Sequence, residues 1–183
     1  MSRQEPISDQ FYNSETNEPF SHCIVCSTNL LSDETEYFIE KIIRRVKQFD
    51  VTEIIFEYAM CLECATSFRS EMSVESLKNV EAYFQSKLKQ RNPIDLTKPS
   101  IDSCLLTGKP LSEASEYSYH VHCKGTNMIH SVFPYAISHL AMDEIAELLS
   151  KETTDELDDF KSKYFNGPPE IAELINPKRL LPL

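Results

Sequence analysis

The chain has 183 residues, of which 41% are hydrophobic and 26% charged, a composition typical of a folded globular protein. Its formal net charge of −11 argues against nucleic-acid binding, which normally requires a basic surface. No stretch approaches the ~18 consecutive apolar residues of a membrane span, and the polar start lacks the apolar run of a signal peptide. We therefore expect a cytoplasmic protein without a membrane partner.

The chain divides into four segments by composition and motif. The first 18 residues are polar and show no hydrophobic periodicity, which predicts a mobile N-terminal arm. Residues 19–92 are expected to bind zinc, and residues 93–176 to form a metal-free degenerate repeat of that segment. Residues 177–183 would be a C-terminal tail.

Four cysteines in two pairs dominate the zinc-binding segment. The pairs are Cys23-x-x-Cys26 and Cys61-x-x-Cys64. Two residues between cysteines let one tight turn aim both sulfurs at one point, and two such pairs are the ligand pattern of a four-thiolate structural zinc site. In the cytoplasm, paired cysteines are more often metal ligands than disulfides. We therefore predict one Zn²⁺ per chain, which would add two negative charges to the formal count.

The residues around these pairs predict a hairpin and a helix. Residues 36–43 and 52–58 are rich in β-branched and aromatic side chains, which favours two strands, with a bend at 48–50. Ser73 can cap a helix that ends before Pro93. Its apolar residues recur at spacings of three and four: Val74, Leu77, Val80, Phe84 and Leu88.

A knuckle, a hairpin and a second Cys-x-x-Cys opening a helix resemble the treble-clef zinc finger, with the zinc ribbon as the alternative. The resemblance covers roughly residues 22–91. It implies that Cys23 and Cys26 are the knuckle ligands and that Cys61 and Cys64 are the pair at the helix. Many such knuckles place glycine after the second cysteine, whereas Ser27 follows here, so Asn29 is the candidate for a left-handed backbone.

A weakened copy of the zinc-binding segment follows in the same order along the chain. A repeat period this long predicts a duplicated domain rather than a solenoid. The matched stretches are residues 23–37 with 104–117, residues 55–61 with 132–138, and residues 73–84 with 154–165.

The copy lacks most of the zinc ligands. It keeps Cys104, which corresponds to Cys23, but a single thiolate cannot hold zinc. The other three ligand positions carry Thr107, Ser138 and Ala141. We therefore predict an α+β fold of two tandem knuckle–β-hairpin–helix halves, packed as a pseudo-symmetric pair, with zinc in the first half only.

Helices are expected to close the second half. One would carry an apolar stripe, the next would begin with a capping box of Thr153 and Glu156, and a short helix over 170–175 would follow. The apolar stripe comprises Ile137, Leu140, Ile145, Leu148 and Leu149.

The alternating segment 117–123 raises the question of chemistry in the second half. On a strand, His120 and His122 share one face, and His130 on the returning strand could join them as a third metal ligand. Cys123 with a histidine could form a nucleophile pair. We favour the simpler interpretation that these histidines face solvent and that Cys123 is a small core residue.

These patterns favour a non-enzymatic, zinc-stabilised protein-interaction module, with basic proteins as the expected partners. The basic clusters at residues 41–47 and 87–91 are interpreted as solvated faces of a strand and a helix end. Three alternatives stay open: a thiol redox or zinc-release switch, nucleic-acid binding through residues 41–47, and a metal-dependent hydrolase centred on the histidines.

Overall fold

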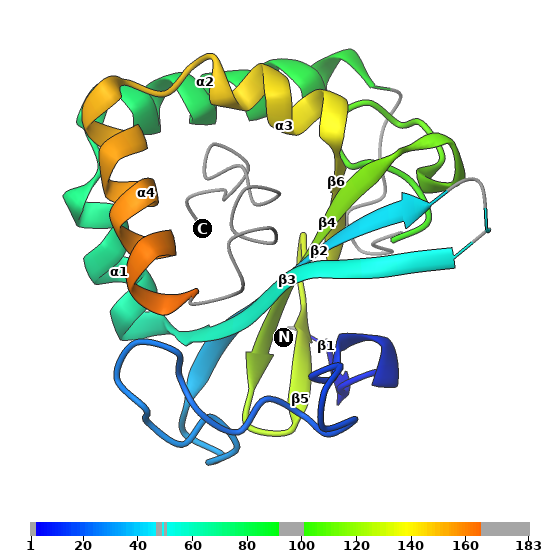
Figure 1. Ribbon diagram of the computed structural model, residues 1–183, viewed down its shortest axis with the longest axis vertical. Helices are drawn as coiled ribbons and strands as arrows, with labels where there is room; N and C mark the ends of the chain where they lie inside the picture. The colour runs from blue at the N-terminus through cyan, green and yellow to red at the C-terminus, as the bar shows by residue number, and fades with distance from the viewer. Residues whose placement is uncertain (1–2, 47–48, 50, 92–100, 166–183) are drawn as a thin grey trace.

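A single antiparallel sheet and four α-helices make up the described part of the chain, which covers residues 3–46, 49, 51–91 and 101–165 of this computed structural model (Figure 1). The strand order is β1-β5-β4-β2-β3, with β6 pairing beside β5 along the same edge of β4. The strands are β1 (Arg3–Pro6), β2 (Glu36–Val46), β3 (Val51–Cys61), β4 (Glu116–Lys124), β5 (Asn127–His130) and β6 (Tyr135–Ser138). The helices are α1 (Leu62–Glu71), α2 (Val74–Gln90), α3 (His139–Ala146) and α4 (Lys151–Tyr164).

The β2–β3 hairpin confirms the two strands predicted from the β-branched and aromatic run. Each strand has 11 residues, and the pairing runs from Tyr37 opposite Cys61 to Val46 opposite Val51. The register shifts once, between Ile42 and Ile43. Because β3 ends at Cys61 and α1 begins at the next residue, the hairpin delivers the second cysteine pair directly to a helix N-terminus.

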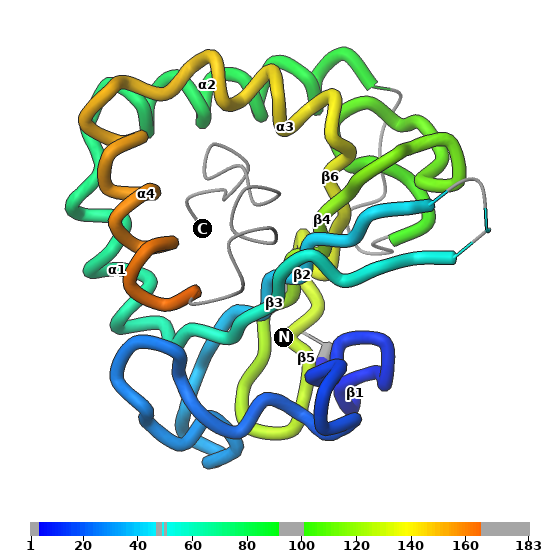
Figure 2. Tube along the Cα trace, in the orientation of Figure 1, coloured from blue at the N-terminus to red at the C-terminus, as the bar shows by residue number. Residues whose placement is uncertain are grey.

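The N-terminal residues are part of the sheet, so the prediction of a mobile arm over residues 1–18 is wrong for its described part. Strand β1 pairs with β5, and the blue N-terminal trace lies beside it (Figure 2). Phe11, in a short 3₁₀ helix (Asp9–Phe11), is only 1% exposed. This segment is held by a few isolated apolar side chains and by pairing with a strand that is distant in the sequence. Neither produces a local hydrophobic periodicity, so the sequence pattern could not reveal it.

Strand β2 from the first half pairs with β4 from the second, so residues 19–92 and 93–176 share one sheet. Glu40 lies opposite His120, which is 80 positions later. Tyr37 lies opposite Cys123, and Ile43 lies opposite Tyr117. Tyr117 lies 80 positions after Tyr37, and Cys123 lies 80 positions after Ile43. The two pairs therefore join equivalent positions of the two strands, and the pairing is symmetric.

The helices pack in two pairs, and each pair joins a helix of the first half to a helix of the second. Helix α1 lies beside α4, with the Phe68 and Phe160 rings 4.7 Å apart, and α2 lies beside α3, with Tyr83 bonded to Glu144 at 2.8 Å (Figure 1). Each half therefore contributes one helix to each pair. This exchange buries apolar helix faces that neither half could cover alone.

Helices α2 and α4 begin at a shared hydrogen-bonded joint. The caps are Ser73 and Ser150, whose hydroxyl oxygens are 2.8 Å apart. The Ser73 amide donates to the Thr153 hydroxyl at 3.0 Å, and the Ser150 amide donates to the Ser76 hydroxyl at 2.7 Å. Ser73 is confirmed as a helix cap, whereas the predicted cap at Thr153 is wrong because α4 begins three residues earlier.

We expect Thr153→Val to destabilise the protein by about 1–3 kcal/mol, because Thr153 is fully buried and its loss leaves the Ser73 amide without an acceptor. Thr66→Val is the matched control, since the exposed Thr66 hydroxyl bonds only to its own helix, and should change stability by less than ~0.5 kcal/mol. Urea unfolding of both variants gives the comparison. Equal losses would contradict the importance of the joint.

Parts of the second-half prediction need correction or lie outside the described residues. Ile137 belongs to strand β6 and Leu140 is 46% exposed, so the predicted apolar stripe does not form one helical face. Buried residues of α3 are instead Ala141, Met142, Ile145 and Ala146. The expected helix over 170–175 and the tail 177–183 lie outside the described residues, as do Gln48 and Asp50 of the predicted bend.

Candidate metal centre

The first cysteine pair lies on a tight turn that precedes the hairpin. The Cys23 amide donates to the Thr28 carbonyl at 2.9 Å, and the Ser27 amide donates to the Cys23 carbonyl at 2.9 Å. Ser27 itself has the left-handed backbone, with φ of 59°, so the expectation that Asn29 would supply it is wrong. The Asn29 side chain instead accepts a hydrogen bond from the Leu31 amide.

The second pair lies where β3 becomes α1. Cys61 is the last strand residue and the helix N-cap, and Cys64 is in the first helical turn. The Ile24 amide donates to the Ala59 carbonyl at 2.9 Å, which ties the turn to β3. The Cys61 amide also donates a hydrogen bond to the Cys23 sulfur at 3.4 Å, which links the two pairs directly.

The four cysteines converge on one point. All four Sγ atoms lie within 4.8 Å of one another, and the Sγ atoms of Cys26 and Cys61 are 3.7 Å apart. A zinc ion with tetrahedral Zn–S bonds of ~2.3 Å would separate its sulfurs by ~3.8 Å. The cluster can therefore hold a metal ion, and its dimensions and soft ligands suit Zn²⁺. None of the four cysteines forms a disulfide.

The environment of the sulfurs differs across the cluster. Cys23 and Cys61 are buried, whereas Cys26 is exposed. Hydrogen bonding with Thr28 lowers the pKa of the Cys26 thiol to about 6. Burial raises the pKa of Cys61 and of Cys64 above the ordinary thiol value. In the absence of metal, Cys26 is thus ionised more readily than Cys61 or Cys64, and its exposure makes it accessible to reagents.

The second half contains a turn with the same hydrogen bonds. The Cys104 amide donates to the Lys109 carbonyl at 2.9 Å, and the Gly108 amide donates to the Cys104 carbonyl at 2.8 Å. Gly108 has φ of 72° and lies 81 positions after Ser27. The Leu105 amide donates to the Ala136 carbonyl at 2.7 Å, which repeats the bond from Ile24 to Ala59.

The positions aligned with the four cysteines also come together in the second half, where only Cys104 carries a sulfur. Burial raises the pKa of Cys104, but hydrogen bonds with Ser138 and Thr107 outweigh it and lower the pKa overall. Ala141 is fully buried in the apolar core. The Cys104 thiol is hydrogen-bonded to two hydroxyl groups, and the fourth position has only the methyl group of Ala141. This set of side chains lacks the ligands that a zinc site needs.

The three histidines do not gather into a second metal site. His122 stacks on Phe38 at 4.7 Å, and His130 contacts Glu5 at 2.7 Å. Among the described residues, the four cysteines are the only group of three or more His, Cys, Asp or Glu side chains close enough to share an ion. Cys123 is a buried core residue as predicted, and burial raises its pKa to about 12, which does not suit a nucleophile.

His120 is fully buried, so the expectation that it faces solvent is wrong. Its Nε2 is 2.8 Å from the Ser118 hydroxyl, and its ring stacks on Tyr135 at 4.9 Å. Burial lowers its pKa to about 3, so the native protein keeps this imidazole neutral. The alternation of the strand placed His120 and His122 on one face correctly but did not show that helices cover that face.

Because the unfolded chain protonates His120 near pH 6.5 and the native state resists protonation down to about pH 3, acid should favour unfolding. The contribution of His120 is complete above pH 6.5 and falls by up to ~1.4 kcal/mol per pH unit below it. We expect urea unfolding between pH 7 and 5 to show a shallower decline in His120→Gln than in the wild type. Parallel declines in both proteins would contradict this prediction.

The basic clusters are largely engaged within the protein. Lys41 is 3% exposed and pairs with Glu57 at 2.9 Å, and Arg44 pairs with Glu116 at 2.7 Å. Lys87 pairs with Glu144 at 2.7 Å. The interpretation as a solvated face is therefore wrong for Lys41, whereas Lys89 at the helix end is exposed, as that interpretation expects. Lys47 lies outside the described residues. The charges of Lys41 and Arg44 are therefore already paired within the protein, which weakens the case for nucleic-acid binding by these two residues.

Comparisons with models of protein families, with curated proteins and with solved structures each found no match. Within the described residues, every helix is too short or too polar to cross a membrane. The chemistry of this chain therefore has to be inferred from the cysteine cluster and its surroundings.

Proposed function

We propose that this protein is a non-enzymatic, zinc-stabilised interaction module that holds one Zn²⁺ through Cys23, Cys26, Cys61 and Cys64. The observation that carries the proposal is the convergence of the four sulfurs. Catalytic zinc sites keep one position open for water or substrate, whereas four thiolates fill the tetrahedron. A four-thiolate site stabilises the fold, and the folded protein can then offer a rigid surface to a partner protein.

We propose a treble-clef arrangement for the zinc-binding half. The support is the order of its parts: a turn that carries Cys23, the β2–β3 hairpin, and a helix opened by Cys61. The bond from Ile24 to Ala59 brings the turn against the hairpin, as this arrangement requires. In such a fold the metal joins two elements that have little other contact, so it contributes directly to folding.

We also propose that the second half is a duplicate that lost its metal ligands. Support comes from the matching turns at Cys23 and Cys104, the exchangeable pairing of β2 with β4, and the reciprocal joint of α2 and α4. An interface between two copies of one unit is expected to be self-complementary in this way. Hydrogen bonding and packing then stabilise the second turn in place of zinc.

Cross-linking in the source cells, followed by mass spectrometry, tests the interaction role. The zinc-loaded chain should be cross-linked to a defined protein, and Cys61→Ser should lose that partner together with the metal. A substrate turned over by the purified chain, with activity lost in His120→Gln or His122→Gln, would contradict a non-enzymatic role.

A zinc-release switch is a second candidate, favoured by the exposure and low pKa of Cys26. Peroxide would oxidise two neighbouring thiolates to a disulfide and be reduced to water, which would release the metal. Mild peroxide treatment with a chromophoric zinc chelator present measures this directly. Zinc that stays bound under conditions that oxidise free glutathione would exclude the switch.

A further inference from the structure

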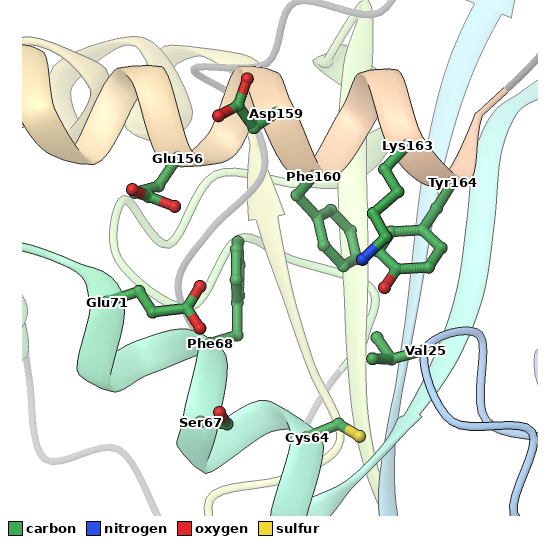
Figure 3. Close-up of a pocket in the computed structure, with 10 residues that line it drawn as sticks. All are labelled: Val25, Cys64, Ser67, Phe68, Glu71, Glu156, Asp159, Phe160, Lys163 and Tyr164. Carbon is green, nitrogen blue, oxygen red and sulfur yellow. The ribbon is translucent and has the colours of Figure 1, made fainter.

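A hollow of about 330 Å³ lies between α1 and α4, next to the cysteine cluster, with Cys64 in its wall (Figure 3). Aromatic and acidic side chains make up most of its other walls, which also include Val25, Ser67 and Lys163. Aromatic rings come from Phe68 on α1 and from Phe160 and Tyr164 on α4. Carboxylates come from Glu71 on α1 and from Glu156 and Asp159 on α4.

The aromatic rings form one continuous surface. Phe160 lies 4.7 Å from Phe68 and 4.9 Å from Tyr164, measured between ring centroids. The Nζ atom of Lys163 lies 5.1 Å from the Tyr164 ring centroid, so the chain already places a cation of its own over this surface. The negative faces of aromatic rings attract cations within about 6 Å.

Two of the three carboxylates lie together at one end of the hollow. Glu71 and Glu156 extend from facing helices on the same side of Phe68, whereas Lys163 and Tyr164 lie on the other side (Figure 3). Within the described part of the chain, neither Glu71, Glu156 nor Asp159 forms a salt bridge. These unpaired charges beside a π surface repel anions and favour a cation.

The dimensions favour an extended cation over a metal ion. The three carboxylates are not among the groups of the described residues whose oxygens come close enough to share an ion. A planar guanidinium can stack on one ring and bond to carboxylates along its edge, which a spherical ion cannot do. A lysine ammonium would also neutralise the carboxylates, but it is not planar and cannot stack on a ring while it donates paired hydrogen bonds.

We propose that the hollow between α1 and α4 binds an arginine side chain of a basic segment in a partner protein. Its guanidinium would pair with Glu71 and Glu156 and stack on Phe68. The inference rests on the proposed interaction function and specifies the surface and the partner chemistry. The net charge of −11 would draw such a segment toward the protein at low ionic strength.

Fluorescence anisotropy with the zinc-loaded full chain tests the proposal. The probe is a labelled octapeptide with two arginines among glycines and serines, compared with peptides that carry lysine or the neutral isostere citrulline at those positions. We expect the arginine peptide to bind more tightly than the lysine peptide, and the citrulline peptide at least about tenfold more weakly.

The decisive comparison uses two variants with the same change in net charge. Glu71→Gln/Glu156→Gln should weaken binding of the arginine peptide by about tenfold or more. Glu34→Gln/Glu63→Gln alters a second hollow, of about 280 Å³, that contacts Cys61, and should leave binding within about twofold. Phe68→Leu, which keeps an apolar side chain, should weaken the arginine peptide more than the lysine peptide.

Two outcomes would overturn the proposal. Equal losses in the two charge variants would mean that only net charge attracts the peptide, and no binding by the zinc-loaded wild type would mean that the hollow is not a cation site. Near-ultraviolet circular dichroism and zinc content verify that every variant is folded. A chain that binds the peptide but carries no zinc would retain this pocket while overturning the proposed zinc-stabilised function.

Discussion

Cys61→Ser should lose zinc and cooperative folding together. Metal binding at four-thiolate sites contributes on the order of 10 kcal/mol to folding, which is comparable to the whole stability of an ordinary domain. Cys61 also joins β3 to α1, so the loss affects the connection between sheet and helix. Thermal unfolding followed by circular dichroism, with zinc measured in the same samples, should show no sharp transition in this variant.

Cys104→Ser is the matched control, because it makes the same chemical change at the corresponding turn of the second half. Cys104 is fully buried and hydrogen-bonded to Ser138, a contact that a serine hydroxyl can preserve. We expect a loss of about 1–2 kcal/mol with the zinc content unchanged. Equal losses in the two variants, or complete metal-free folding of Cys61→Ser, would contradict a zinc site confined to the first half.

Lys41→Met should destabilise the protein by about 3–5 kcal/mol. The buried Lys41 ammonium pairs with Glu57 and donates to the backbone carbonyls of Gln10 and Tyr12. Its removal would leave the Glu57 carboxylate, which is 10% exposed, without its cation and would detach the N-terminal segment from β2. Urea unfolding measures the free-energy change, and limited proteolysis reports whether the N-terminal segment becomes accessible.

Lys78→Met provides the comparison, because it removes the same charge from an exposed position on α2. Methionine has a helix propensity close to that of lysine, so the change should stay within ~0.5 kcal/mol. A Lys41 effect as small as that of Lys78 would show that the buried pair with Glu57 contributes little.

The sequence predicted local features of the fold well. The cysteine spacing identified both pairs of the cluster, the β-branched runs located β2 and β3, and Ser73 marked the start of α2. Each of these signals acts within a few residues: a turn, a strand alternation or a helix cap. One local detail was wrong, because Ser27 and not Asn29 adopts the left-handed backbone of the turn.

Features that depend on residues far away in the sequence were not predicted, or were predicted with the wrong burial. No local pattern indicates that Arg3–Pro6 adds to β5 or that the Lys41 ammonium reaches back to Tyr12. The alternation that placed His120 on one face of β4 could not tell which face the helices cover. The cap of α4 was misplaced at Thr153 because its true role, as the acceptor for the Ser73 amide, comes from the other half.

The same distinction applies to the candidate sites. Four cysteines can be recognised in a sequence because few other residues bind metals so specifically. Two Cys-x-x-Cys pairs indicate one shared site however many residues separate them. The hollow between α1 and α4 gives no such signal. Glu71 and Glu156 are ordinary surface residues of two helices, and only the packing of Phe68 against Phe160 brings them to one place.

X-ray absorption at the zinc edge of the purified protein, combined with elemental analysis, tests the central claim most directly. We expect one zinc per chain with four sulfur ligands at ~2.3 Å. Protein without tightly bound zinc, or zinc coordinated by nitrogen and oxygen, would contradict a site formed by the four cysteines.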